Sequence, residues 1–308
     1  MNKEVIQKLH EILRYSKWSQ EQLAYNLGVS FSTLNAWING KANPRSKALR
    51  AIDATYLDVV GRVVVDSTLL KEAKRNVSSR RISAKQIVEN EQLLDKITLF
   101  LTYHTNTIEG STMTLADVRE VLSNDNRVLA NKTAREQTEA RNHRSALFFL
   151  LDELNSLGER FTWTEDIILN IHLRLMNTII SDAGSYRRGG VRIMGSPIAL
   201  ANFVKIPDLM NEFVASLNQP ADDTISKIAR LHAEFERIHP FSDGNGRTGR
   251  LIMFIQALQC NLLPPLILKE RKHAYYKYLE IAQSGEKYDP LILFVAESML
   301  ATGDLIDK

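Results

Sequence analysis

The sequence of 308 residues contains a single cysteine, Cys260, and no uninterrupted apolar stretch that could cross a membrane. A membrane span needs about 18 such residues, and one thiol excludes both an internal disulfide framework and a cysteine-ligated metal cluster. The first residues, MNKEVIQKLHEILRY, lack the apolar core of a secretory signal. These absences predict a protein of the reducing cytoplasm that has no membrane partner, with Cys260 as a small core residue.

The chain also carries little net charge. Its 39 Lys and Arg residues against 36 Asp and Glu residues give a formal charge of +3. That excess is too small to indicate a nucleic-acid-binding protein, so the position of the charge matters more than its total. Hydrophobic residues make up 44% of the chain and charged residues 24%. This is the composition of a globular protein, and the length suits two domains.

Helical patterns dominate the chain, and their breaks indicate its organisation. Residues 1–56 are polar with helical periodicity and a short break at NGKANPRS. Residues 57–92 contain VVGRVVV, which suggests a short strand, and LLKEAKRNVSSRRISAK, whose basic, serine-rich character indicates a linker or an exposed helix. From residue 93 onward apolar residues recur at three- and four-residue spacing. One of these helices is predicted to open with a capping box from Thr162 to Glu165.

The twelve residues HPFSDGNGRTGR, at positions 239–250, separate two apolar helical patterns. The preceding helix must end near Pro240, because proline disfavours helical geometry in the residue before it. The following segment predicts a buried helix that begins close to Asn245. Unpaired backbone N–H groups, glycines that permit close approach and the positive end of the helix dipole would then form a site for phosphate.

Charged side chains in this loop predict its chemistry. Arg247 and Arg250 lie three residues apart, so both face one side of the first helical turn, and two guanidinium groups indicate more than one phosphate. Asp243 in so positive a site is interpreted as a ligand of Mg²⁺ that bridges a polyphosphate. His239 is suited to accept a proton from an attacking hydroxyl. The alternative is a structural turn with a capping histidine and solvated arginines.

The loop matches residue for residue the motif HPFx(D/E)GNGRxxR, and the chain resembles the Fic (filamentation induced by cAMP) domain family over roughly residues 90–300. The resemblance implies transfer of AMP from ATP to a Ser, Thr or Tyr hydroxyl of a protein, with release of pyrophosphate. It implies that His239 is the general base and that Asp243 binds Mg²⁺. The nucleotide-site residues it implies are Phe241, as the apolar anchor of the loop, and Gly244, Asn245, Gly246, Arg247 and Arg250. The family's Doc-like kinases carry lysine at the position of Gly246, so the glycine favours nucleotidyl transfer over phosphorylation.

Glu109 precedes Gly110 at the end of the helical pattern ENEQLLDKITLFLTYHTNTIEG. A carboxylate there faces the negative end of the helix dipole at a cost of up to about 1 kcal/mol, which a solvated glutamate tolerates. Thr105 to Gly110 also match the family's inhibitory motif, (S/T)xxxE(G/N). The resemblance implies that Glu109 pairs with Arg250, blocks the seat of the γ-phosphate and keeps the activity low.

Two further segments are interpreted with the same resemblance. Glycines and alternating apolar residues in SYRRGGVRIMGSPIAL predict a small β-hairpin. Residues 191–197 resemble the family's flap, which holds a target segment as an added strand; a purely structural hairpin is the alternative. Residues 275–282 resemble the region that lines the adenine pocket, which makes Tyr275 a candidate nucleotide contact, although the sequence itself predicts only an amphipathic helix.

The segment WSQEQLAYNLGVSFSTLNAWINGKANPRSKAL predicts a helix-turn-helix, with a capping box at Ser19, a turn at Gly28 and a second helix from Ser30. It resembles the Xre/Cro repressor-like DNA-binding domains over roughly residues 5–56, although Phe31 is unusually bulky for its exposed position. The residues that would contact DNA bases or phosphates are Ser32, Thr33, Asn35, Asn39, Lys41 and Arg45. Residues 1–56 hold eight Lys and Arg against four Asp and Glu, a local excess of +4. A helical hairpin used for protein contacts is the alternative.

Together these features predict an all-α protein: a mainly helical Fic fold with a small β-hairpin flap, plus a small helix-turn-helix domain. The expected domains are a DNA-binding domain at 1–56, a linker at 57–92 and a Fic domain with an N-terminal inhibitory helix at 93–308. The expected function is self-inhibited, Mg²⁺-dependent protein adenylyl transfer from ATP by a DNA-binding protein. The alternatives are a transcriptional regulator whose Fic domain senses nucleotide or modifies its own chain, and an enzyme that removes AMP. The expected partners are ATP, DNA and a target protein or the chain itself, and paired repressor half-sites would suit a homodimer.

Overall fold

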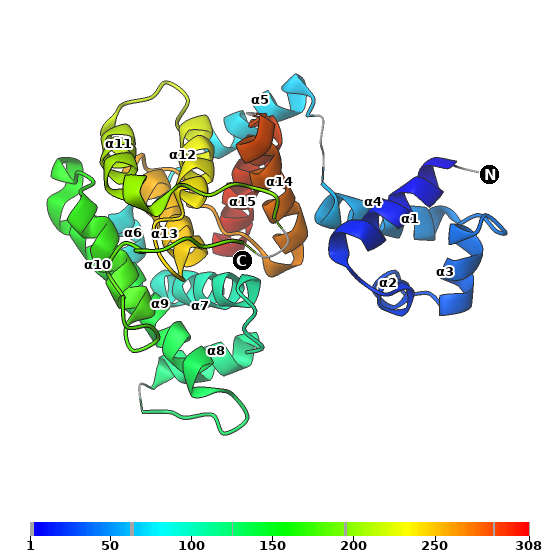
Figure 1. The fold of residues 1–308 in the computed structure, drawn as a ribbon, viewed down its shortest axis with the longest axis horizontal. Helices are drawn as coiled ribbons and strands as arrows, with labels where there is room; N and C mark the ends of the chain where they lie inside the picture. The colour runs from blue at the N-terminus through cyan, green and yellow to red at the C-terminus, as the bar shows by residue number, and fades with distance from the viewer. Residues whose placement is uncertain (1–2, 62–64, 125, 194–195, 286, 308) are drawn as a thin grey trace.

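The computed structural model describes residues 3–61, 65–124, 126–193, 196–285 and 287–307, which form two helical bodies of unequal size (Figure 1). The smaller body contains α1 (Lys3–Ser16), α2 (Gln20–Asn26), α3 (Phe31–Ile38) and α4 (Ser46–Val59). The larger body contains α5 (Ser67–Ser78), α6 (Ala84–Val88), α7 (Glu91–Ile108), α8 (Leu115–Ser123), α9 (Ala134–Leu157), η1 (Gly158–Arg160), α10 (Glu165–Met176), η2 (Phe203–Lys205), α11 (Ile206–Asn218), α12 (Thr224–Ile238), α13 (Asn245–Gln259), η3 (Lys269–Arg271), α14 (Lys272–Gly285) and α15 (Asp289–Ile306). The all-α prediction is confirmed. Within the described residues, no helix combines the length and the apolar character that a membrane span requires.

Local capping places the helices of the smaller body where the sequence predicts them. The Ser19 hydroxyl accepts from the N–H of Gln22, and the Gln22 side chain accepts from the N–H of Ser19, which completes a capping box before α2. Ser30 caps α3 through the N–H of Thr33. Gly28 has a φ of +65°, which lets the chain turn between α2 and α3 without steric strain.

The segment predicted as a linker, 57–92, belongs largely to the two bodies. α4 runs to Val59, which is buried in the core of the smaller body. α5 buries Leu70 and Val77 in the core of the larger body. The basic and serine-rich composition conceals these apolar positions, which share one face of a helix. The strand suggested by VVGRVVV falls partly on residues 62–64, which lie outside the described residues.

α13 lies at the centre of the larger body and is buried over nearly its whole length. α12 packs along it, and α7, α9 and α10 also contact it. The apolar run LIMFIQAL favours this burial, because such a helix has no polar face to turn to solvent. The first turn of α13 is therefore held rigidly, directly after the loop at 239–244.

Two local predictions are wrong. Thr164, and not Thr162, caps α10, where its hydroxyl accepts from the N–H of Ile167. The helix begins later than predicted because Trp163 is anchored in the core and its backbone N–H donates to Oδ1 of Asn218. Cys260 is exposed and not in the core, because it is the C-cap of α13, where the chain turns away.

The predicted β-hairpin strands in residues 185–200 do not form among the described residues, which exclude 194–195. The N–H of Arg187 donates to the carbonyl of Pro240 at 2.9 Å, and the N–H of Ala201 donates to the carbonyl of Arg237 at 3.2 Å. The backbone N–H groups at both ends of the segment thus bond to the chain around His239 and not to each other as in a hairpin.

Candidate active site

His239 is the C-cap of α12 and adopts a left-handed conformation, with a φ of 50° and a ψ of 61°. This conformation strains a residue with a β-carbon by about 1–2 kcal/mol, so neighbouring contacts must hold it. The backbone N–H of His239 donates to Phe235 at 2.9 Å, and Nε of Arg187 donates to the carbonyl of His239 at 2.7 Å. Strained residues that are held in this way cluster at functional sites.

The imidazole of His239 is oriented as a proton acceptor. Nδ1 lies 3.3 Å from the backbone carbonyl of Glu236, and because a carbonyl only accepts, Nδ1 carries the hydrogen. Nε2 therefore keeps its lone pair. Burial lowers the pKa of His239 to about 4, so the ring is neutral at physiological pH. A neutral Nε2 can take a proton from a hydroxyl group.

Side chains within and beneath the loop hold its backbone. Asn245 Oδ1 accepts from the N–H of Phe241, and Asn245 Nδ2 donates to the carbonyl of Phe241, both at 2.9 Å. The buried ring of Phe241 stacks on His172 with the ring centroids 3.6 Å apart. His172 Nε2 donates to the carbonyl of Asp243 at 3.0 Å, and its Nδ1 accepts from the N–H of Gly184 at 2.9 Å. Phe241 and Asn245 thus shape the loop in which the sequence predicts them as nucleotide-site residues.

The N-terminus of α13 has the geometry of an anion site. Gly244, with a φ of +80°, is the N-cap, and the N–H groups of the first turn have no acceptor within the helix. A β-carbon at Gly246 would lie 2.5 Å from Oε1 of Glu109, so only glycine allows this carboxylate so close to the helix end. A carboxylate of the chain itself therefore lies against the first turn of α13, the helix end at which the sequence predicts phosphate.

Arg250 joins this helix end to the end of α7. Its Nη2 lies 2.5 Å from Oε1 of Glu109, and its Nε donates to Oγ1 of Thr105 at 2.6 Å. Burial alone would lower the pKa of Arg250, but the Glu109 carboxylate together with Tyr275 and Tyr276 raises it above its usual value. Nη1 of Arg250 is buried without a hydrogen-bond acceptor among the described residues. The pairing implied by the inhibitory motif is present, and Arg250 keeps a donor for a further anion.

Asp243 lies among cations. Its Oδ2 is 2.9 Å from Nη2 of Arg135, and its Oδ1 is 3.6 Å from Nη2 of Arg247. Arg247 is buried, and its Nη1 lies 3.1 Å from Oε1 of Glu139. In the described part of the chain, Nε of Arg247 meets no hydrogen-bond acceptor. Arg247 and Arg250, near the N-terminus of α13, thus both retain buried donors that suit a polyphosphate.

The residues around Asp243 fit Mg²⁺ when a polyphosphate is bound as well. Mg²⁺ is usually bound through one or two carboxylates plus substrate phosphates, and the Asp243 side chain is 44% exposed. Among the described residues, no cluster of three or more His, Cys, Asp or Glu side chains could hold a metal ion. A metal ion at Asp243 would compete with Arg135 for Oδ2.

A buried polar network lies beneath the loop. His232 Nε2 and the Tyr275 hydroxyl are 2.7 Å apart, and burial raises the pKa of Glu236 to about 7. Tyr275, a predicted nucleotide contact, is only 1% exposed, and its ring lies 6.0 Å from the Arg250 guanidinium. Its neighbour Tyr276 is 40% exposed. Tyr275 therefore lies beside Arg250 in the protein interior, while the ring of Tyr276 is accessible to a ligand.

Sequence reasoning missed four residues that support this site. Arg135 and Glu139 lie on α9, His172 on α10 and Arg187 in the segment after it. Each meets the loop through a contact between residues at least 52 positions apart. No local pattern marks such a contact in a single sequence.

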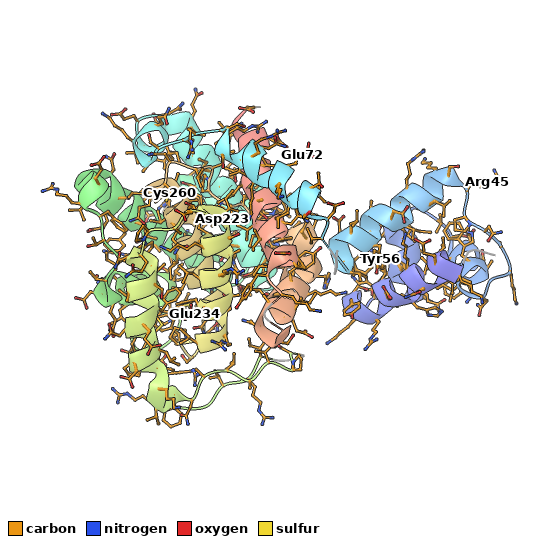
Figure 2. All side chains as sticks on the ribbon, turned by 90° about the horizontal axis from the view of Figure 1, so that it is seen from above. Arg45, Tyr56, Glu72, Asp223, Glu234 and Cys260 are labelled. Carbon is orange, nitrogen blue, oxygen red and sulfur yellow. The ribbon has the colours of Figure 1, made fainter. Side chains whose placement is uncertain are left out.

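The residues predicted to contact DNA lie on α3 and in the turn after it. Ser32, Asn39, Lys41 and Arg45 are exposed, while Thr33 and Asn35 are half-buried. Figure 2 shows Arg45 on the side of the smaller body remote from the larger one. Asn35 accepts from Asn39 Nδ2 at 3.1 Å and donates to Gln20 at 3.3 Å, which links α2 to α3. Four of the six predicted DNA contacts are therefore exposed to solvent.

α14 contacts both bodies. Nζ of Lys277 lies 3.9 Å from the centroid of the Tyr15 ring, and His273 meets Trp18 edge to face at 6.1 Å. The Tyr278 hydroxyl fills the space over Gly61, where an added β-carbon would lie 2.3 Å from it. The same helix carries the Tyr275 that supports Arg250. One helix thus connects the smaller body with the candidate active site.

The chain matches two known protein families. Residues 162–257 match the Fic/DOC family, and residues 9–56 match a helix-turn-helix family. The chain therefore contains a Fic domain preceded by a helix-turn-helix domain.

Its curated relatives include proteins named protein adenylyltransferase Fic. The one from Aedes aegypti is 30% identical over 239 residues, which cover 76% of this chain and 46% of the relative. The one from Nematostella vectensis is 33% identical over 204 residues, which cover 66% of this chain and 47% of the relative. The chain spans about half the length of the curated relatives it matches.

Solved structures show the same fold. Fic-1 from C. elegans has a TM-score of 0.66 at 23% identity, and the match covers 93% of this chain and 84% of that one. A Fic family protein from Desulfovibrio desulfuricans G20 has a TM-score of 0.64 at 25% identity, with 79% and 75% covered. The prediction of a Fic fold is confirmed.

Proposed function

We propose that this chain is a self-inhibited, Mg²⁺-dependent protein adenylyltransferase that transfers AMP from ATP to a Ser, Thr or Tyr hydroxyl. The observation that carries the proposal is that one loop provides both a proton acceptor and the start of a phosphate-binding helix. It presents a neutral Nε2 of His239 and leads directly into a helix N-terminus with two buried arginines. A proton acceptor beside a polyphosphate site is the arrangement that transfer from ATP needs. The names of the curated relatives support this activity.

The chemistry follows from these groups. His239 Nε2 takes the proton of the target hydroxyl as its oxygen bonds to the α-phosphorus of ATP. The bond from the α-phosphorus to the oxygen that bridges it to the β-phosphorus breaks, and pyrophosphate leaves with the electron pair. Arg247, Arg250 and the N–H groups of α13 stabilise the negative charge on the phosphates. Mg²⁺ on Asp243 would neutralise part of that charge.

Self-inhibition follows from the position of Glu109. Its carboxylate lies over Gly246 and pairs with Arg250, so it competes with phosphate for the same helix end and the same guanidinium. Full seating of ATP then requires Glu109 to move.

The proposal is tested by the mass of the modified protein, since AMP transfer adds an AMP group whereas phosphorylation adds only a phosphoryl group. The reverse activity would appear as loss of AMP from a modified protein.

The second part of the proposal is that the smaller body binds DNA through α3 and the basic turn after it. Lys41 and Arg45 are exposed on a body with a local excess of positive charge, and no acidic residue separates them in the sequence. Such residues neutralise phosphates and release counterions, which makes binding salt-dependent.

Lys41→Glu/Arg45→Glu is expected to weaken DNA binding at least tenfold and to reduce the salt slope of log K by about 2, one for each lost phosphate contact. The measurement is the affinity for a sequence selected from a randomised DNA pool, at several salt concentrations. Lys71→Glu/Arg75→Glu is the matched control, because it changes the net charge equally on exposed residues of α5. An equal loss in both double variants would contradict a DNA site on α3.

A second candidate function is a transcriptional regulator in which the Fic domain senses nucleotide or modifies its own chain. The contacts of α14 favour it, because this helix meets the smaller body and also carries Tyr275 beneath Arg250. Displacement of Glu109 by a nucleotide would change the environment of Arg250, and α14 offers a direct path to the helix-turn-helix.

For such a regulator, ATP is expected to change the affinity for DNA by about 5- to 150-fold, and DNA is expected to change the affinity for ATP by the same factor. Both affinities are measured on the full chain with His239→Asn, so that no covalent modification occurs. A ratio of one in both directions would show independent domains and would eliminate this candidate, while leaving adenylyl transfer unaffected.

A further inference from the structure

Arg187 is a buried guanidinium that binds four backbone carbonyls. It is 4% exposed. Nε donates to His239 at 2.7 Å and Nη1 donates to Gly189 at 2.7 Å. Nη2 donates to Ala201 at 2.6 Å and lies 3.4 Å from the carbonyl of Ile238. Within the described residues it forms no ion pair with a carboxylate at 4 Å or less, so these carbonyls are the groups that compensate for its burial.

The four carbonyls come from two places in the fold. Those of Ile238 and His239 end α12, where the helix dipole is negative and a cation is favourable. Those of Gly189 and Ala201 mark the beginning and the end of the segment that follows Arg187 in sequence. One side chain thus ties both ends of this segment to the residue that carries the predicted catalytic base.

The bond to His239 bears directly on the strained part of the site. His239 has a left-handed backbone, and its own carbonyl accepts from Nε of Arg187. The N–H of Arg187 also donates to the carbonyl of Pro240, the next residue, at 2.9 Å. Arg187 therefore holds the carbonyls of both His239 and Pro240. Rotation of these two peptide groups would move the imidazole of His239.

We propose that Arg187 is a positioning residue for AMP transfer, which holds the left-handed backbone of His239 and thereby fixes the direction of its imidazole. The inference rests on the adenylyl transfer proposed for this chain. Lysine cannot replace this function, because an ammonium group is a point charge and cannot reproduce the planar fork that reaches all four carbonyls.

The test compares Arg187→Lys with Arg188→Lys, both in the active Glu109→Gly background. Arg188 is the exposed neighbour and the matched control. The concentration of ATP-binding sites is titrated in each preparation, and rates are divided by it. Misfolded protein, which binds no ATP, then does not lower the measured kcat. Arg187→Lys is expected to lower kcat about 100-fold, since small misplacements of a catalytic group have effects of this size. The KM for ATP is expected to change by less than about twofold, because the phosphate site is untouched. Arg188→Lys is expected to leave both values unchanged.

Hydrogen exchange supplies a second readout. In Arg187→Lys the amides of residues 187 and 201 are expected to exchange faster, while those of α13 keep their protection. An unchanged kcat would overturn the inference, and so would a loss of ATP sites that accounts for the whole loss of rate. If Glu109→Gly alone transfers no AMP, the proposed function fails, and hydrogen exchange then shows separately whether Arg187 holds the backbone around His239.

Discussion

Glu109→Gly is expected to raise the initial rate of AMP transfer about 10- to 100-fold over the wild-type chain. The Glu109 carboxylate lies over Gly246 and 2.5 Å from Nη2 of Arg250, the guanidinium that is proposed to bind the phosphates of ATP. A charge-assisted contact of this kind is worth about 1.5–3 kcal/mol, and each 1.36 kcal/mol corresponds to a tenfold change in rate. The measurement is incorporation of AMP into protein at saturating ATP and Mg²⁺.

Glu109→Gln is the matched variant for this prediction. The amide keeps the size of the side chain and an oxygen acceptor, but it removes the charge that pairs with Arg250. We expect an intermediate rate, because the side chain still occupies part of the site while its hold on Arg250 is weaker. A Glu109→Gly protein that binds ATP but transfers AMP no faster than the wild type would contradict inhibition by this carboxylate.

His239→Asn is expected to lower the rate of the Glu109→Gly protein by about 10²- to 10⁴-fold, the usual contribution of a general base, without a change in ATP affinity. Asparagine is chosen because residue 239 has a φ of 50°, and asparagine tolerates the left-handed region better than alanine does. The variant therefore removes the base while it keeps the loop. A rate within about tenfold of the parent would exclude His239 as the base.

The pH dependence of the Glu109→Gly protein is the companion measurement. The base works when it is deprotonated, and burial lowers the pKa of His239 to about 4, so the neutral form persists well below neutral pH. The rate is therefore expected to stay level from about pH 8 to about pH 6 and to fall only in more acidic solution. An unburied histidine would already lose half of its activity near its ordinary pKa of about 6.5. ATP binding, measured at each pH, separates this effect from loss of the site.

The sequence predicts those parts of the site that depend on neighbours along the chain. Pro240 ends α12, Gly244 starts α13, and apolar residues on every face of α13 indicate its burial. The hydroxyls of Ser19 and Ser30 set the helix starts of the smaller body in the same local way. The position of Glu109 opposite Arg250 required the family resemblance, because the two residues are 141 positions apart.

Other features could not be predicted from the sequence because they depend on tertiary contacts. Alternating apolar residues after Arg187 predict a hairpin, but the backbone there bonds to the end of α12, which no local pattern indicates. Asn245 belongs to a nucleotide-binding motif, yet in the structure its side chain bonds to the N–H and the carbonyl of Phe241 and braces the loop. α5 was missed as a core helix because its charged and serine-rich composition masks the apolar stripe through Leu70 and Val77.

The most direct test of the account is the intact mass of three proteins after incubation with ATP and Mg²⁺: the wild type, Glu109→Gly and Glu109→Gly/His239→Asn. If the chain can modify itself, an AMP adduct is expected on the single variant, little on the wild type and none on the double variant. With a separate protein substrate, the same order is predicted for the adduct on that substrate. An adduct of the mass of phosphate, or an AMP adduct that persists in the double variant, would contradict adenylyl transfer by His239.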